Sequence, residues 1–251
     1  MNILLTNDDG IYAEGIYALY EALTKIGNVT VVAPEAEQSA VGHAITMSDP
    51  LRIKDAYRRR KHFGYAVSGT PADCVKIAII KLLKRKPDLV VSGINMGPNI
   101  GFSVLYSGTV SGATEGAILG IPSIAVSLGT FTKADFSFAA AFSAKVAKKV
   151  HKYGLPKGTL LSINVPARKA SKIKGIKVTT QGKTPIFENF VKRTDPRKRT
   201  YYWLTGEVMD LRGDRESDIV ALKNGYVTIT PLKYDLTDYG FLGDLKKWKF
   251  K

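Results

Sequence analysis

Hydrophobic residues near the start of the chain follow two different patterns. Residues 2–6 form a short apolar run without alternation, which is typical of a strand buried on both faces of a parallel sheet. In residues 14–26 the apolar positions recur every three or four residues, which predicts an amphipathic helix. Residues 29–33 predict a second strand, which Pro34 ends. Strand, helix and strand in this order predict a βαβ unit with parallel strands.

The alternation of strands and helices continues beyond this unit. Residues 44–67 break the helical rhythm, and their short apolar runs predict a β-hairpin excursion. Thr70 is a suitable N-cap for a helix that begins at Pro71. These elements predict an α/β fold, a Rossmann-like three-layer sandwich with a mostly parallel sheet. The remaining strands are expected at 89–91, 123–128, 160–165 and 176–180, and further helices at 109–119 and 135–151.

The pattern changes after Gly182, which predicts a division of the chain. We assign residues 1–182 to an α/β core, with a return strand expected at 226–230, and residues 183–251 to a C-terminal extension. Residues 185–199 are polar and basic, and residues 200–204 are strand-like. The tail from residue 235 carries a short helix, and its apolar side chains need a cover, either the chain's own core or a partner subunit. These side chains are Phe241, Leu242, Leu245 and Trp248.

The composition narrows the possible classes of protein. The 251 residues are 45% hydrophobic and 24% charged, which is ordinary for a globular protein. No apolar run approaches the roughly 18 residues that a membrane-spanning helix needs, so no membrane partner is expected. The single cysteine, Cys74, cannot form an intrachain disulfide, and it falls within the helix after Thr70, where we expect it to be a core residue. A reducing, cytoplasmic location is the simplest expectation.

The net charge of +15 raises the question of a nucleic-acid partner. Basic residues are scattered along the chain and form no single tract, which favours a solvated basic surface. A non-catalytic nucleotide or nucleic-acid binding protein is therefore the alternative interpretation, and it predicts salt-dependent binding. The basic clusters lie at 58–61, 81–86, 148–149, 168–174, 192–199 and 246–251.

The first strand ends at a pair of adjacent carboxylates, Asp8 and Asp9, followed by Gly10. In open α/β sheets, ligands bind beyond the carboxyl ends of the strands. In a regular strand the two carboxylates would point to opposite faces, so sharing a cation requires the chain to leave strand geometry here, and Gly10 gives it that freedom. Hard oxygen ligands suit Mg²⁺, Mn²⁺ or Ca²⁺. These residues by themselves are equally compatible with a solvated turn.

Two later polar side chains also follow predicted parallel strands. Ser39 lies in a polar loop, residues 34–42, after the second strand, and Asn95 follows the third. Because the carboxyl ends of parallel strands meet at one edge of a sheet, both converge on the edge that carries Asp8 and Asp9. His43, just after the same loop, is a possible acid or base, although a lone histidine in a loop is more often structural.

Residues 92–117 form a long glycine-rich segment that leads into a helix. It contains neither a dinucleotide fingerprint nor a P-loop, which argues against a Rossmann-type oxidoreductase. Such a segment can still surround an anion with backbone N–H groups, and a helix N-terminus favours phosphate. Ser107, Gly108 and Thr109 stand at the start of the helix, and Asn99 offers an amide. Long loops of this kind are usually functional in compact domains.

Five of these segments, in this order, resemble the survival protein E (SurE) family of metal-dependent nucleotidases. The resemblance spans about residues 1–130, and residues 228–238 also look like that family. The segments that carry it read ILLTNDDG, VVAP with Gln-Ser, SGTPADCV, DLVVSGINMGPN and YSGTVSGATEG.

The resemblance implies roles for the candidate residues. One divalent ion per subunit, Mg²⁺ or Mn²⁺, would be held by Asp8, Asp9, Ser39 and Asn95, with Asp8 and Asp9 also catalytic. Phosphate would be recognised near Ser107, Gly108 and Thr109, with Asn99 close by. The family's activity is hydrolysis of nucleoside 5′-monophosphates, in some members also of 3′-monophosphates and short polyphosphate. Family members form homodimers or homotetramers and exchange C-terminal segments, which would be the role of residues 183–251.

Overall fold

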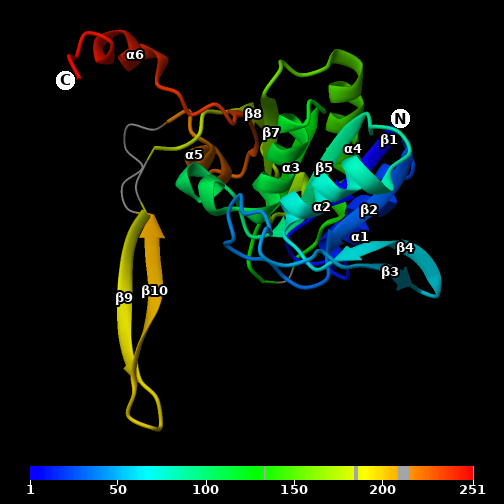
Figure 1. Ribbon diagram of the computed structural model, residues 1–251, viewed down its shortest axis with the longest axis horizontal. Coiled ribbons are helices and arrows are strands. Elements are labelled where there is room, and N and C mark those ends of the chain that lie inside the picture. The colour runs from blue at the N-terminus through cyan, green and yellow to red at the C-terminus, as the bar shows by residue number, and fades with distance from the viewer. Residues whose placement is uncertain (133, 184–185, 209–214, 251) are drawn as a thin grey trace.

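The computed structural model describes residues 1–132, 134–183, 186–208 and 215–250, with the backbone alone at 186–188 and 207–208. Within these residues the core is a nine-stranded sheet with strand order β3-β4-β2-β1-β5-β6-β7-β11-β8 (Figure 1). The strands are β1 (Asn2–Thr6), β2 (Asn28–Pro34), β3 (Ile53–Arg58), β4 (Lys61–Val67), β5 (Leu89–Met96), β6 (Ser123–Gly129), β7 (Thr159–Pro166), β8 (Ile176–Val178) and β11 (Val227–Lys233).

Six neighbouring strands, from β4 to β7, run parallel to one another. The antiparallel pairs lie towards the two ends of the sheet, where β3 pairs with β4 and β11 pairs with β7. The prediction of a mostly parallel sheet is therefore confirmed. The predicted hairpin excursion is the pair β3–β4, and β4 also extends the main sheet by pairing with β2. The return strand was predicted at 226–230 and is β11.

Helices cover both faces of the sheet, which confirms the three-layer architecture. Alternate residues of β1 divide between two cores. Leu5 packs with the cluster that contains α1 (Glu14–Leu23) and α4 (Ser137–Tyr153). Leu4 packs with the cluster that contains α2 (Pro71–Ile77). The helix α3 (Gly108–Ile118) lies beside α2 and packs against β5 and β6.

Small residues allow α3 to approach the sheet closely. A Cβ atom at Gly116 would lie 2.4 Å from the Ser123 hydroxyl oxygen, and one at Gly112 would lie 3.0 Å from the Ser92 hydroxyl oxygen. Larger side chains at these positions would push the helix away from β5 and β6. The glycines therefore set the height of α3 over the sheet, and with it the position of the N-terminus of the helix.

The C-terminal part of the chain divides between the core and two projecting pieces. After residue 182, the short helix α5 (Asp218–Lys223) and β11 return to the core. The strands β9 (Ile186–Thr194) and β10 (Thr200–Val208) form a separate hairpin that extends away from the core, and α6 (Tyr239–Leu245) lies apart from it (Figure 1). The strand-like segment at 200–204 is part of β10, whereas β9 was read only as polar and basic. The division at residue 182 stays a prediction.

Several local expectations can be checked against these elements. Thr70 is the N-cap of α2, in a capping box with Asp73, as the sequence indicated. Cys74 is a buried free thiol of the core. No helix in the described parts of the chain is long and apolar enough to cross a membrane.

We expect Asp73→Ala to lower the free energy of unfolding by about 3 kcal/mol, because buried and partly buried donors would lose a charged acceptor. The Asp73 carboxylate accepts hydrogen bonds from the Thr46 N–H at 3.0 Å, the Thr46 hydroxyl at 2.6 Å and the Thr70 N–H at 3.0 Å. Urea unfolding measures the change. The matched control is Asp55→Ala, whose exposed carboxylate pairs with His62, and an equal loss in both variants would contradict the expectation.

Candidate active site

The chain leaves strand geometry directly after β1, as a shared cation site would require. The Asn7 side chain is buried, and its amide nitrogen donates a hydrogen bond to the Gly10 carbonyl at 2.9 Å. Gly10 has a φ of +95°, a conformation that other residues rarely adopt. The turn is thus ordered from inside by Asn7, a residue to which the sequence analysis gave no role. It places Asp8 and Asp9 at the carboxyl edge of the sheet.

Asp8 is buried, with 5% of its surface exposed, and it contacts the first turn of α3. The Thr109 hydroxyl donates a hydrogen bond to Asp8 Oδ1. Burial raises the pKa of the Asp8 carboxyl above its ordinary value, and hydrogen bonds from the hydroxyl and N–H of Thr109 oppose this rise. The Asp8 carbonyl also accepts a hydrogen bond from the Gln38 N–H at 2.8 Å, which ties the loop after β2 to this turn.

Asp9 lies beside Asp8 and is turned towards the end of β5. Its Oδ2 atom accepts a hydrogen bond from the Met96 N–H at 3.3 Å. Burial, and next the negative charge of Asp8, raise the pKa of the Asp9 carboxyl to about 6. Among the ion pairs of the described residues, no lysine, arginine or histidine pairs with Asp8 or Asp9. Two adjacent carboxylates, one buried and one partly buried, without a basic partner in these ion pairs suit a divalent cation.

Ser39 and Asn95 are the other two predicted metal ligands. Asn95 was expected to follow a strand at 89–91, but β5 continues to Met96 and contains Asn95 near its end. The pairing of β5 with β6 shifts register between Ser92 and Asn95. Its amide nitrogen donates to the Gly97 carbonyl at 2.7 Å, so the Asn95 amide has its oxygen to offer to a cation. Ser39 is exposed, and its hydroxyl donates to Glu37 Oε1 at 2.5 Å.

The predicted donor set therefore consists of two carboxylates and two neutral oxygen groups. In the parts of the chain that the structure describes, no group of three or more His, Cys, Asp and Glu side chains could hold a metal ion. A set of two carboxylates, one amide oxygen and one hydroxyl is chemically suited to Mg²⁺ or Mn²⁺, which prefer hard oxygen ligands. The residues present thus fit the ion that the sequence analysis expected.

The start of α3 lies directly against Asp8. A Cβ atom at Gly108 would lie 2.7 Å from the Asp8 Cβ atom, so this position has room only for glycine. Ser107 is the N-cap of α3, and its hydroxyl accepts a hydrogen bond from the Val110 N–H at 3.0 Å. The positive end of the helix dipole therefore faces the two carboxylates. This contact brings Asp8, one of the predicted metal ligands, together with Gly108 and Thr109, two of the predicted phosphate-binding residues.

Asn99 takes part in a network that the sequence analysis missed. Its amide nitrogen donates to the Ser127 hydroxyl at 2.8 Å. The Asn164 side chain accepts a hydrogen bond from the Asn99 N–H at 2.8 Å and donates one to the Asn99 carbonyl at 2.9 Å. Asn99 is thus fixed to the ends of β6 and β7, and its amide nitrogen is engaged there. Ser127 and Asn164 are polar residues inside otherwise apolar strands, and this was the sequence feature that could have indicated a buried hydrogen-bond network.

Among the described residues, no hydrogen bond joins His43 to Asp8 or Asp9. Its Nε2 atom lies 2.9 Å from Glu115 Oε2, on α3. Glu115 was also missed, although it is the one acidic residue among the small residues of α3.

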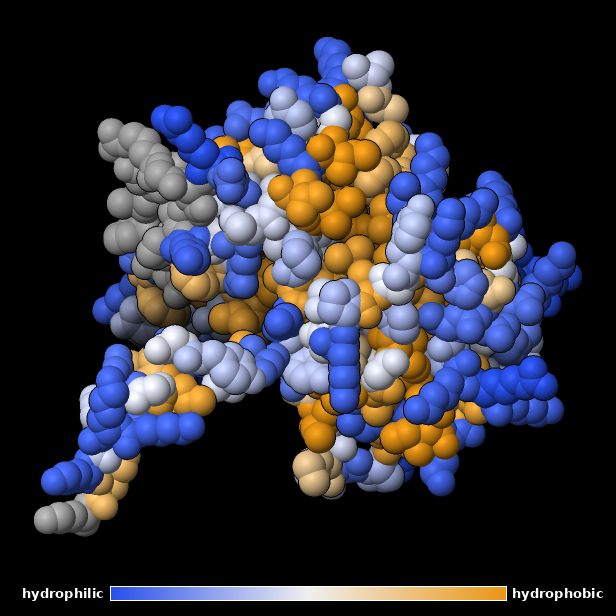
Figure 2. Space-filling model, turned by 90° about the horizontal axis from the view of Figure 1, so that it is seen from above, coloured by the Kyte–Doolittle hydropathy of each residue, from blue (hydrophilic) through white to orange (hydrophobic). Residues whose placement is uncertain are grey.

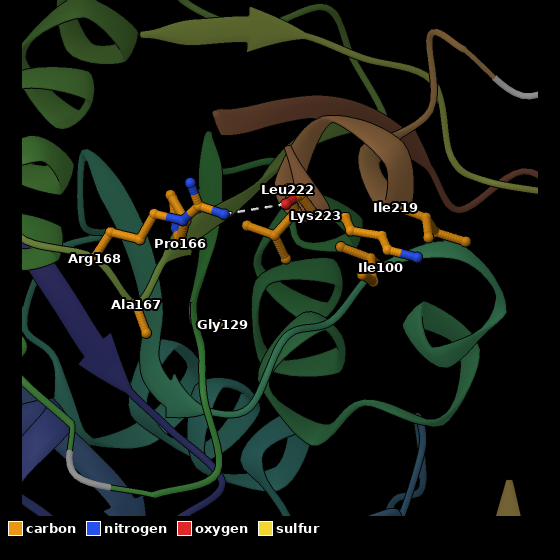
Figure 3. A pocket seen from close by; sticks show the side chains of 8 residues that line it. All are labelled: Ile100, Gly129, Pro166, Ala167, Arg168, Ile219, Leu222 and Lys223. Carbon is orange, nitrogen blue, oxygen red and sulfur yellow. Dashed lines mark hydrogen bonds between the residues drawn. The ribbon is translucent and has the colours of Figure 1, made fainter. Parts of the chain in front are cut away.

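Two pockets lie near this edge of the sheet. The first has a volume of about 450 Å³ and lies at the ends of β6 and β7, next to Asn99. Its walls are apolar apart from the cationic side chains of Arg168 and Lys223, and the Arg168 guanidinium donates a hydrogen bond to the Lys223 carbonyl (Figure 3). None of the predicted site residues lines it. The second, of about 390 Å³, is bordered by Ser107 and His43 and by the segment after β11.

Comparison with known proteins identifies the family. The family model described as survival protein SurE matches residues 3–188 of the chain. The chain belongs to the SurE family. The 5′-nucleotidase SurE of Syntrophobacter fumaroxidans is 52% identical over 248 residues, which cover 99% of both proteins. The 5′-nucleotidase SurE of Syntrophus aciditrophicus is 53% identical over 247 residues, which cover 98% of this chain and 93% of that protein.

A solved structure supports the same assignment. The SurE protein from Aquifex aeolicus superimposes with a TM-score of 0.86 at 45% identity, covering 98% of each chain. The resemblance inferred from the five sequence segments is thus confirmed, and so is the α/β fold that it implied. The likeness to the SurE relatives extends over the C-terminal segments, beyond the residues that the family model matches.

We expect Thr109→Val to raise the pKa of the Asp8 carboxyl further, because the hydroxyl hydrogen bond that stabilises the carboxylate would be lost. In a ¹³C NMR titration of the metal-free protein, the Asp8 carboxyl would then take up its proton at a higher pH than in the wild type. Thr109→Ser keeps a hydroxyl and is the matched control. An unchanged Asp8 titration in Thr109→Val would contradict this assignment.

Proposed function

We propose that this chain is a metal-dependent 5′-nucleotidase, a phosphoric monoester hydrolase that removes phosphate from nucleoside 5′-monophosphates. The SurE relatives that match it along nearly the whole chain are named 5′-nucleotidases. The observation that carries the proposal is the contact between Asp8 and Thr109, because it unites a carboxylate pair with the N-terminus of a helix. A phosphate ester needs both a cation and backbone donors around its oxygens.

The proposed metal ligands are Asp8, Asp9, Ser39 and Asn95, with one Mg²⁺ or Mn²⁺ per subunit. When bound, the ion supplies positive charge against the phosphate oxygens and lowers the pKa of a water molecule. Gly108 and Thr109, in the first turn of α3, and the hydroxyl of Ser107 then hold and orient the phosphate group. The glycine-rich segment that carries Asn99 closes the site on the side of β6 and β7.

We assign to Asp8 the role of general base, which accepts a proton from the water molecule that attacks phosphorus. Asp8 is buried beside the helix N-terminus, and burial raises the pKa of its carboxyl above the ordinary value, which favours proton uptake. The alternative, in which Asp8 itself attacks phosphorus, is less favoured. In phosphatases of the haloacid-dehalogenase type the two aspartates are separated by two positions, whereas Asp8 and Asp9 are adjacent.

The substrate range that we propose includes nucleoside 3′-monophosphates and short polyphosphate as further substrates. Nothing in the comparisons favours the alternative of a non-catalytic nucleotide or nucleic-acid binding protein. The buried single cysteine, Cys74, agrees with the cytoplasmic location that we propose.

We expect Asp8→Asn to lower kcat/KM for nucleoside monophosphates at least about 100-fold, because the site would lose a ligand and a proton acceptor. Phosphate release from AMP, GMP, CMP and UMP, with EDTA and then with a series of divalent ions, measures the activity. EDTA should abolish it, and Mg²⁺ or Mn²⁺ should restore it. The matched control is Asp88→Asn. Asp88 stands directly before β5, at the amino ends of the parallel strands, and its carboxylate accepts a hydrogen bond from the Asn2 N–H at the start of β1. Full activity in Asp8→Asn at unchanged metal would refute the proposal.

We also propose that residues 183–251 assemble the protein into a homodimer or homotetramer by exchange between subunits. The β9–β10 hairpin exposes aromatic side chains away from the core, and Trp203 has 59% of its surface exposed. Figure 2 shows hydrophobic residues among hydrophilic ones on the projecting C-terminal segment. There, the Phe241 and Trp248 rings pack edge to face. Exposed apolar surfaces of this kind support a contact with another subunit.

We expect Trp203→Lys to shift the protein to a smaller assembly in light scattering coupled to size exclusion, because the exposed hairpin would lose its largest apolar side chain. Tyr153→Lys is the control, because Tyr153 is an aromatic residue with 72% of its surface exposed, but it lies at the end of α4 and outside the C-terminal segments. The proposal fails if the wild type is a monomer, or if both variants keep the wild-type mass.

A further inference from the structure

Glu115 is a buried charged residue that the proposed chemistry does not use. It lies on α3, and 3% of its side-chain surface is exposed. Its two carboxylate oxygens have different partners. Oε2 lies 2.9 Å from the Nε2 atom of His43, at the end of the loop after β2. Oε1 lies 2.6 Å from the ammonium of Lys76, on α2. One buried carboxylate thus joins three separate segments of the chain.

The charge on Glu115 is maintained by these partners. Burial by itself would raise the pKa of the Glu115 carboxyl, but the hydrogen bonds from His43 and Lys76 outweigh it and lower the pKa below the ordinary value. The carboxylate is therefore ionised and can only accept hydrogen bonds. His43 must consequently donate through Nε2. A buried carboxylate with two donors is a firm anchor point, because leaving it unpaired would be costly.

The loop that ends at His43 carries Ser39, one of the proposed metal ligands. The loop is attached to the site at few places. The Gln38 N–H donates to the Asp8 carbonyl at 2.8 Å, before Ser39, and the Gly42 N–H donates to the Tyr106 carbonyl at 3.0 Å, after it. Ser39 itself is exposed between these points. The His43–Glu115 hydrogen bond attaches the end of this loop to α3, the helix whose N-terminus meets Asp8. The next residue, Ala44, is attached to α2 instead, because its carbonyl accepts a hydrogen bond from the Thr70 hydroxyl at 2.7 Å.

We propose that His43 and Glu115 are positioning residues that hold the loop of Ser39 at the metal site by anchoring it to α3. Neither residue touches the metal or the substrate. Their hydrogen bond sets the distance between the Ser39 loop and the helix that Gly108 brings against Asp8. The inference rests on the proposed metal-dependent function, because it assigns these residues to the geometry of that metal site.

Lys76 provides a way to separate this role from general stabilisation. It binds the same buried carboxylate as His43, but it lies on α2, and the ion pair that the described residues show for it is with Glu115 and not with the Ser39 loop. A residue that merely stabilised Glu115 would give the same result whichever partner is removed. A residue that positions the loop would affect metal binding only when His43 is changed. In His43→Ala the Glu115 carboxylate keeps Lys76, so the fold is expected to persist.

The experiment compares His43→Ala, His43→Gln and Lys76→Met with the wild type. Mn²⁺ affinity is measured by calorimetry, backbone hydrogen exchange is measured in residues 36–42, and phosphate release from AMP is measured over a range of Mn²⁺ concentrations. Loss of a group that orients a metal ligand weakens affinity by about 10- to 100-fold. We expect the Kd for Mn²⁺ to rise about tenfold in His43→Ala, with faster exchange in the loop and with activity restored by added Mn²⁺.

The other two variants supply the controls. The amide nitrogen of the glutamine side chain in His43→Gln can replace the Nε2 donor, so this variant should keep a Kd close to that of the wild type. Lys76→Met should lower the melting temperature but leave the Kd for Mn²⁺ unchanged. Equal Mn²⁺ affinity in His43→Ala and the wild type would overturn the inference, and so would equal losses in His43→Ala and Lys76→Met. If the wild type itself neither binds Mn²⁺ nor releases phosphate, the proposed function fails instead.

Discussion

The contact between the N-terminus of α3 and Asp8 is the interaction on which the site depends. It exists because the helix lies unusually close to the sheet, and that closeness comes from glycine at three positions. Gly112 and Gly116 let α3 pack onto β5 and β6, and Gly108 lets its first turn meet the Asp8 side chain. As a result, the Thr109 hydroxyl reaches a carboxylate that lies 101 residues earlier in the chain. A larger residue at any of these positions would separate the two halves of the site.

The same contact explains how two adjacent carboxylates are kept in a largely buried place. Burial opposes their ionisation, and mutual repulsion adds to this effect at Asp9. The helix dipole and the hydrogen bonds from Thr109 offset part of this cost, but no basic side chain in the ion pairs of the described residues offsets the rest. A bound divalent cation would do so. The electrostatics of Asp8 and Asp9 thus support the proposed metal site and, through it, the proposed phosphate site.

The sequence predicted those features that depend on local pattern. The buried runs identified the parallel strands, and the polar residues after them identified the edge that carries Asp8, Asp9 and Asn95. Pairing between distant segments left weaker signals. The His43–Glu115 hydrogen bond joins residues 72 positions apart, so nothing near either residue indicates it. The strand β9 was missed because it belongs to a hairpin outside the core, where no buried face imposes an alternation of apolar and polar residues.

Asn99 shows a further limit of reading a site from sequence. Its place in a glycine-rich segment indicated a phosphate contact, because amides commonly bind anions there. In the structure its amide nitrogen donates to Ser127, and its backbone is held by Asn164. Both partners lie inside apolar strands, and a polar residue there can equally be satisfied by the neighbouring backbone. Only the folded chain shows which polar groups are shared and which remain for a ligand.

The most direct measurement is a crystal structure with Mn²⁺ and inorganic phosphate, in which anomalous scattering locates the metal. If the metal and phosphate sites meet at Asp8, the anomalous map will show one Mn²⁺ ion bound by the carboxylates of Asp8 and Asp9. The phosphate will then contact both this ion and the first turn of α3 at Gly108 and Thr109. A Mn²⁺ ion bound elsewhere, or a phosphate that does not share the site with the ion, would contradict a meeting of the two sites at Asp8.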